Sequence, residues 1–158
     1  MIRGYCIGGG LGLAVCCDLR ICSDNSTFGI PAAKLGLGYG DPGVKRLSDL
    51  VGPSFAKEIF YTARQFNAAE AQTMGLVNRV LPADKLEEYV KGYADTIGGN
   101  APLTVNAVKF IANQTVADEG KRDLKRCAEM VKRCFDSKDY IEGRRAFMEK
   151  RKPVFKGR

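Results

Sequence analysis

Proton chemistry in this chain is restricted to a few side-chain types, because its 158 residues include no histidine. A Ser-His-Asp triad, a Cys-His dyad and a histidine-ligated metal site are therefore excluded. Any acid or base must be Asp, Glu, Lys, Tyr or Cys. The six cysteines, at positions 6, 16, 17, 22, 127 and 134, form no Cys-x-x-Cys pair. We expect buried free thiols in a reducing compartment, with a disulfide framework as the alternative.

Two glycine-rich stretches are the other features that could take part in binding or catalysis. Gly8-Gly9-Gly10 follows residues 1–7, which are typical of the end of a buried strand, and precedes residues 11–17, which predict a short buried helix. A strand, a glycine loop and a helix in this order direct backbone N–H groups toward a ligand oxygen. Three glycines alone are weak evidence, because glycines also permit close packing. Residues 36–43 contain four glycines and form either a binding loop or a packed connector.

The elements that must position these loops change character along the chain. Turn residues and helical periodicity predict short strands at 19–23, 27–30 and 76–80, and helices at 44–51, 54–63, 68–74, 83–97, 102–115, 118–136 and 138–150. Asn67 and Glu70 form a capping-box sequence at the start of the predicted helix at 68–74, and Gly75 is a typical residue for its end. We expect the α/β part to end near residue 100 and a helical region to follow.

Positive charge is concentrated near the C-terminus. Residues 121–158 hold 14 Lys and Arg against 6 Asp and Glu, whereas residues 1–120 hold 11 against 12. This asymmetry indicates either an anionic partner, such as a phosphate group, nucleic acid or an acidic subunit, or a solvated helix face. No apolar run reaches the ~20 residues that span a bilayer, so no transmembrane helix is expected, and no secretory signal is predicted.

Sequence blocks along nearly the whole chain resemble the crotonase family, the enoyl-CoA hydratase/isomerase superfamily. The blocks lie at 3–14, 17–20, 28–31, 35–38, 46–47, 51–52, 68–71, 74–78 and 146–153, in family order and at family spacing. The resemblance implies an α/β fold, with a partial crotonase-like ββα spiral core at 1–100 and a helical region at 101–158. Family members begin earlier, so we expect a C-terminal fragment or a truncated product that lacks the strands supplying one oxyanion donor.

The resemblance also implies an acyl-CoA thioester substrate whose enolate oxygen is held by two backbone N–H groups. Gly9 matches the second of these donors, and Gly8 and Gly10 flank it as CoA-binding residues. One such donor is worth roughly 10²–10³ in rate. No resident cofactor is implied, since coenzyme A enters as part of the substrate, and no metal site is expected.

The residues that hydratases of the family use for water are missing. The two family glutamates match Gly12 and Ala32, neither of which can ionise. General acid–base catalysis contributes about 10²–10⁴, so we expect negligible hydration of crotonyl-CoA. Other members use an acid in the glycine-rich loop, which makes Asp41 a candidate and Tyr39 and Lys34 nearby alternatives. Gly-Asp-Pro-Gly is also ordinary turn chemistry.

The C-terminal helix carries a second implied site. Residues like Phe147 and Lys150 reach the CoA bound by a neighbouring subunit in the family, where the ring packs by the adenine and the lysine meets phosphate. A solvated helix end is the alternative for Lys150 and for Arg151. The resemblance implies that 101–158 is a trimerisation region, that the chain forms a homotrimer or hexamer, and that it is intracellular, in the cytoplasm or mitochondrial matrix.

Two classes of function stay open at this point. The first is an acyl-CoA enzyme of the hydratase/isomerase type, and the second is a non-catalytic crotonase-like assembly or binding protein. The absence of carboxylates at both Gly12 and Ala32 discriminates against a classical hydratase. Nucleic-acid binding is not expected, because no aromatic–basic platform beyond Phe147 supports it.

Overall fold

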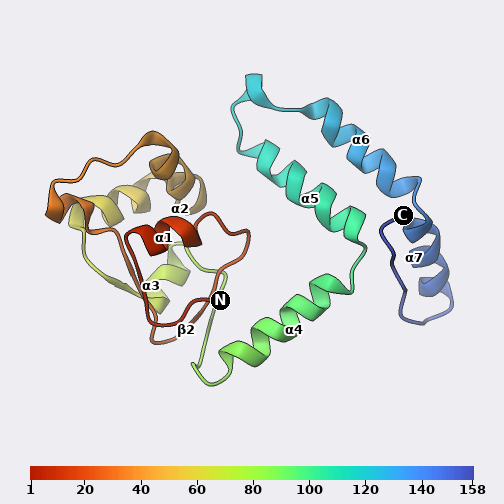
Figure 1. Cartoon of the computed structure of the whole chain (residues 1–158), viewed down its shortest axis with the longest axis horizontal. Coiled ribbons are helices and arrows are strands. Elements are labelled where there is room, and N and C mark those ends of the chain that lie inside the picture. The colour runs from red at the N-terminus through yellow and green to blue at the C-terminus, as the bar shows by residue number, and fades with distance from the viewer. The chain divides into compact units, whose positions relative to one another are not determined.

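The computed structural model describes all 158 residues and divides into two compact units. The N-terminal unit is Met1–Val90 and the C-terminal unit is Lys91–Arg158 (Figure 1). The division falls inside helix α4 (Leu86–Gly98). Leu86, in the first turn of α4, is fully buried, and this contact assigns the start of the helix to the N-terminal unit.

Two small sheets organise the N-terminal unit. In the first, β1 (Tyr5–Ile7) pairs in parallel with β3 (Thr27–Gly29), which pairs antiparallel with β4 (Phe66–Asn67). The buried side chains of Cys6, Phe28 and Phe66 lie in register across it. In the second, β2 (Ile21–Ser23) pairs in parallel with β5 (Arg79–Leu81). The expected strands at 19–23 and 27–30 are confirmed in shortened form, whereas the third lies later than 76–80.

The expected short helix after β1 is present, but as α1 (Gly9–Ala14) it begins two residues before the expected start at 11, includes two of the three glycines and ends before 17. The expectation that this segment is buried throughout is wrong, because only Leu11 is fully enclosed. The helical period turns Leu11, Ala14 and Val15 toward the core. Leu13 points away and is 71% exposed. An apolar sequence therefore does not identify which faces of a one-and-a-half-turn helix are covered.

A buried arginine ties the end of this segment to a distant part of the chain. Arg20 is 5% exposed, and its guanidinium donates to the carbonyl oxygens of Cys17 at 2.5 Å and Leu76 at 2.7 Å. The Arg20 backbone N–H donates to Asn78 Oδ1, and the Asn78 N–H donates back to the Arg20 carbonyl, both at 2.7 Å. These bonds satisfy polar groups that would otherwise be costly to bury.

A 3-10 turn (Pro31–Leu35) and the glycine-rich loop connect β3 to helix α2 (Asp41–Thr62). Helix α2 is interrupted at Gly52, which has φ of 78°, and Pro53 follows. The expected break between two helical segments is confirmed, since a positive φ suits glycine and the next proline cannot donate an N–H. Leu47 and Ile59, one on each side of the break, are buried in the core.

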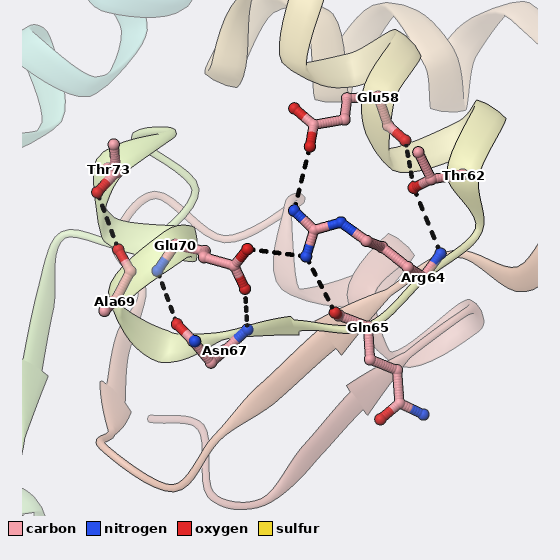
Figure 2. A network of polar contacts seen from close by, with 8 residues as sticks. All are labelled: Glu58, Thr62, Arg64, Gln65, Asn67, Ala69, Glu70 and Thr73. Atoms are coloured by element: carbon pink, nitrogen blue, oxygen red, sulfur yellow. Dashed lines mark hydrogen bonds and ion pairs between the residues drawn. The ribbon is translucent and has the colours of Figure 1, made fainter.

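An arginine-centred network joins the end of α2 to helix α3 (Ala68–Thr73), as Figure 2 shows. Asn67 Oδ1 accepts from the Glu70 N–H and Glu70 Oε2 accepts from the Asn67 N–H, both at 2.9 Å, so the predicted capping box is confirmed. Arg64 pairs with Glu70 at 2.8 Å and with Glu58 at 3.1 Å. Its guanidinium lies 3.8 Å from the centroid of the Phe66 ring, so one side chain joins three elements.

Helices α5 (Pro102–Thr115), α6 (Leu124–Phe135) and α7 (Lys138–Met148) make up most of the C-terminal unit. The expected helix at 118–136 starts later, because a short 3-10 turn (Glu119–Lys121) precedes it and Asp123 caps its first turn. Helices α5 and α6 pack against each other. Ala107 and Ala146 are the only fully buried apolar residues of this unit. None of the helices has the length and apolar character needed to cross a membrane.

Residues 152–158 turn back along α7. The Asp139 carboxylate accepts from the N–H groups of Lys156 at 2.8 Å and Gly157 at 2.7 Å. One turn on, Glu142 binds the Arg151 guanidinium through two contacts of 2.6 and 3.0 Å and accepts from the Val154 N–H. Two acids on one face of α7 therefore hold the returning segment.

All six cysteines are free thiols. Cys6 and Cys22 are buried, and burial raises the pKa of both thiols, that of Cys22 to about 11. The expectation of burial is wrong for the exposed Cys16 and Cys17, and the two cysteines of α6 are half-buried. The two exposed thiols follow the end of α1.

Candidate functional site

The glycine turn between β1 and α1 presents open backbone donors. Gly8 has φ of 57° and ψ of −117°, a conformation that side chains rarely tolerate. Its N–H donates to the Gly29 carbonyl at 2.8 Å, which anchors the turn to β3. The first helical bond runs from the Gly12 N–H to the Gly8 carbonyl at 3.0 Å. The N–H groups of Gly9, Gly10 and Leu11 therefore have no carbonyl one turn earlier to accept from them.

Packing does not explain two of the three glycines. A Cβ built on Gly9 or Gly10 would meet nothing within 4 Å. By contrast, a Cβ on Gly29 would lie 2.9 Å from the Arg64 carbonyl oxygen, so that glycine is required for packing. Gly9 and Gly10 instead leave the start of α1 unobstructed, and Gly10 borders a cavity of about 340 Å³.

The positions that match the hydratase glutamates border two neighbouring cavities. Gly12 borders one of about 290 Å³, and Ala32, buried in the turn after Pro31, borders one of about 440 Å³. Tyr39 borders both. A Cβ on Gly12 would lie 3.6 Å from Tyr39 Oη. The phenol therefore occupies the space next to the absent Gly12 side chain.

The acid and base candidates of the glycine-rich loop differ in their placement. Asp41 is the exposed first residue of α2, where a negative charge suits the helix dipole, and it borders neither cavity. Its catalytic role stays a prediction. Lys34 is also exposed and borders neither cavity. Tyr39 is the one loop candidate that contacts both, which its position in the sequence did not indicate.

The C-terminal candidates lie together at the end of α7. Phe147 is 82% exposed and borders an apolar cavity of about 570 Å³ formed by α5, α6 and α7. Lys150 is exposed, and its ammonium makes no ion pair within the chain. Arg151 forms ion pairs with Glu142 and Glu149 of its own chain, which favours the alternative that it belongs to the helix end and does not bind CoA. Its hydrogen bond and that of the Val154 N–H lower the pKa of Glu142 to about 2.

Lys150 has an uncommon backbone conformation, with φ of 53°. The Arg151 N–H donates to the Ala146 carbonyl at 3.0 Å and the Lys150 N–H donates to the Phe147 carbonyl at 3.2 Å. This is a Schellman ending, in which glycine is the preferred left-handed residue. Helix α3 ends in the same way with glycine, since Gly75 has φ of 77° and Leu76 donates to Ala71 at 2.9 Å.

Parallel strands joined by glycine turns and short helices, followed by a helical C-terminal unit, define a protein of the crotonase fold. The chain belongs to the enoyl-CoA hydratase/isomerase family, whose sequence profile matches residues 1–158. The expected fold class is confirmed by solved structures. The chain superimposes on an enoyl-CoA hydratase/carnithine racemase from Magnetospirillum magneticum with a TM-score of 0.87 and 38% identity, covering 98% of this chain and 57% of that one.

Curated relatives agree with this assignment. The chain is 41% identical over 154 residues to a crotonyl-CoA hydratase from Syntrophomonas wolfei, a match that covers 98% of this chain and 59% of the relative. It is 40% identical over 161 residues to a carnitinyl-CoA dehydratase from Proteus mirabilis, covering 99% of this chain and 62% of the relative. The chain thus spans less than two thirds of the length of these relatives.

Proposed function

We propose that this protein binds an acyl-CoA thioester and stabilises the thioester enolate, with the Gly9 N–H as an oxyanion donor. The observation that carries the proposal is the open end of α1, where the N–H groups lack helical acceptors and no packing contact requires glycine at position 9. The anchored Gly8 turn holds these donors before charge develops, which is the condition for strong electrostatic stabilisation.

The proposed reaction is not standard hydration. Gly12 and Ala32 provide no carboxylate beside the two cavities, so water activation by a glutamate pair is missing. The relatives are named a hydratase and a dehydratase of CoA thioesters. Enolate chemistry is the step that such reactions share with isomerisation, and it needs the oxyanion donors but not both glutamates. An isomerase-like reaction therefore fits this chain better than hydration.

Coenzyme A is proposed to contact Phe147 and Lys150. A residue with a Cβ in the left-handed region destabilises the fold by roughly 1–2 kcal/mol. Lys150 has this strain at the end of α7, whereas α3 ends with glycine at position 75 and has none. Strain of this kind is often retained where a side chain has a function. An unpaired ammonium beside an exposed ring is suited to a phosphate and an adenine.

Assembly through the C-terminal unit is the accompanying proposal, as a homotrimer or hexamer. Two fully buried alanines are a small core for Lys91–Arg158. Large apolar side chains of this unit that are more than half exposed are Val108, Val116, Leu124, Phe135, Ile141, Phe147, Met148 and Val154. A surface of this kind favours a partner. The same observation supports the second candidate function, a non-catalytic assembly or binding protein.

A pair of substitutions at position 9 tests the enolate proposal. Gly9→Pro removes the donor at the first helical position, where proline is well tolerated. Gly9→Ala keeps the N–H, and its Cβ would meet no atom within 4 Å. Each protein is bound to butanoyl-CoA labelled with ¹³C at the thioester carbonyl. We expect a downfield shift of that resonance with the native chain and Gly9→Ala, and none with Gly9→Pro. An equal shift in all three would exclude Gly9 as a donor.

A further inference from the structure

The Tyr39 side chain is held in place by its ring. The ring packs edge-on against Phe60, with centroids 4.9 Å apart. A Cβ on Gly43 would lie 2.9 Å from Tyr39 Cε1, so the absence of a side chain at position 43 makes room for the ring. Phe60 belongs to α2 and Gly43 to its first turn. The Tyr39 ring is therefore held against α2 by these contacts.

The Tyr39 hydroxyl takes no part in these ring contacts. It makes no hydrogen bond within the chain, and the residue is half-buried. Two other polar groups border the 290 Å³ cavity. The Cys16 thiol donates to the Gly12 carbonyl at 3.2 Å, and the Arg46 guanidinium offers hydrogen-bond donors only. An unengaged hydroxyl with donor and acceptor capacity thus faces the Gly12 position from the cavity wall.

The Gly12 position, which the Tyr39 hydroxyl faces, lies in the same short helix as the proposed oxyanion donor. Gly12 follows Gly9 by three helical residues, which is about 4.5 Å along the axis of α1. A glutamate at position 12 would extend from a Cβ that already lies 3.6 Å from Tyr39 Oη. The Tyr39 hydroxyl therefore lies in contact distance of the place where a side chain at position 12 would begin.

We propose that Tyr39 is a catalytic residue that exchanges a proton with the α-carbon of the bound thioester. This inference rests on the proposed acyl-CoA function. In the forward step the O–H bond breaks and its proton goes to the α-carbon, whose new C–H bond uses the electron pair of the enolate double bond. The oxyanion becomes the thioester carbonyl again. The reverse step starts from the phenolate, which forms when the Tyr39 hydroxyl gives its proton to water in the open cavity; the phenolate oxygen then takes the α-proton, which re-forms the O–H bond and the enolate. The phenol exchanges this proton with water before it is returned to the α-carbon.

Deuterium incorporation tests this role without assuming an overall reaction. The native chain is incubated with butanoyl-CoA in D₂O, and deuterium at the α-carbon is followed by mass spectrometry. Tyr39→Phe keeps the ring on Phe60 and Gly43 but removes the proton. We expect its exchange rate to fall about 100-fold or more, which is the scale of one acid–base group. Tyr61→Phe is the matched control, because Tyr61 borders the 440 Å³ cavity but is 75% exposed.

The ¹³C carbonyl shift described for Gly9 is recorded on the same samples. Tyr39→Phe should retain that shift and the thermal midpoint, so that only proton exchange is lost. Native exchange rates in Tyr39→Phe would overturn the assignment, as would loss of the carbonyl shift together with exchange, which would indicate a positioning role. A native chain that shifts the carbonyl but exchanges no deuterium would overturn the Tyr39 step and leave thioester binding intact. A chain that binds no acyl-CoA would overturn both.

Discussion

Lys150 offers a substitution in which stability and binding should change in opposite directions. Its left-handed backbone, with φ of 53°, strains any residue with a Cβ, while its ammonium is free for a phosphate. Lys150→Gly removes both the strain and the charge. Lys150→Ala removes the charge alone. Comparison of the two separates the backbone effect from the side-chain effect at one position.

The expected magnitudes follow from these two contributions. Glycine should raise the free energy of unfolding by about 1 kcal/mol, the lower end of the cost of a left-handed Cβ, and alanine should leave it nearly unchanged. Both variants should weaken CoA binding by about 1–2 kcal/mol, or roughly 5–30-fold in Kd, if one charge-assisted hydrogen bond is lost. Higher salt should weaken native binding and reduce the difference, because the contact is exposed.

The assays are calorimetry with CoA and thermal unfolding of each variant at matched oligomer size. Lys152→Ala is the control, because this neighbouring lysine is exposed and has no left-handed backbone. Unchanged affinity in both Lys150 variants, or an equal loss with Lys152→Ala, would refute the reasoning that the strained lysine serves CoA. The C-terminal helix would then be assembly surface only, which favours the non-catalytic candidate.

Three further predictions concern hydratase activity, the dependence of stability on pH and the reactivity of the thiols. Since Gly12 and Ala32 carry no carboxylate, hydration of crotonyl-CoA measured by loss of enoyl absorbance should be negligible, and robust turnover by homogeneous protein would contradict this. The pKa of Glu142 is lowered from 4.5 to about 2 by Arg151 and the Val154 N–H, so its contribution to stability is present above about pH 4.5 and is lost as the pH falls toward 2. Hydrogen exchange should show the Val154 amide losing protection over that range, and Glu142→Gln should abolish the pH dependence. Ellman titration should detect six thiols after denaturation, but before it the exposed Cys16 and Cys17 should react fastest, the half-buried Cys127 and Cys134 more slowly, and Cys6 and Cys22 not at all, so a reaction of more than four thiols in the folded chain would contradict the buried placement.

Features encoded by neighbouring residues were predictable from the sequence. The capping box of Asn67 and Glu70, the stop at Gly75 and the break at Gly52-Pro53 depend on local hydrogen bonds and backbone angles, and all three occur as expected. The triple-glycine turn before a short helix is equally local. The order of the strands and helices was predictable from the family resemblance, because the matching sequence blocks extend over nearly the whole chain.

Features that depend on distant contacts were not predictable. The exposure of Leu13 depends on which side of α1 the core covers, and an apolar run does not contain that information. The placement of Tyr39 requires Phe60, which is far away in sequence, and space beside Gly43. Asp139 and Glu142 bind backbone N–H groups of residues 154–157, and helical periodicity alone does not indicate that the chain returns to them.

The buried Arg20 has a consequence for how variants of this protein would be interpreted. Its guanidinium links the segment that follows α1 to the Leu76 carbonyl, and α1 begins at Gly9, the proposed oxyanion donor. An Arg20 variant would leave the buried Leu76 carbonyl oxygen and the part-buried Cys17 carbonyl oxygen without this donor and loosen the helix whose orientation sets the direction of that N–H. Its kinetic phenotype would resemble that of an active-site mutant although the side chain never meets substrate. Genetic screens for loss of activity would thus recover a residue whose role is to keep a donor aligned.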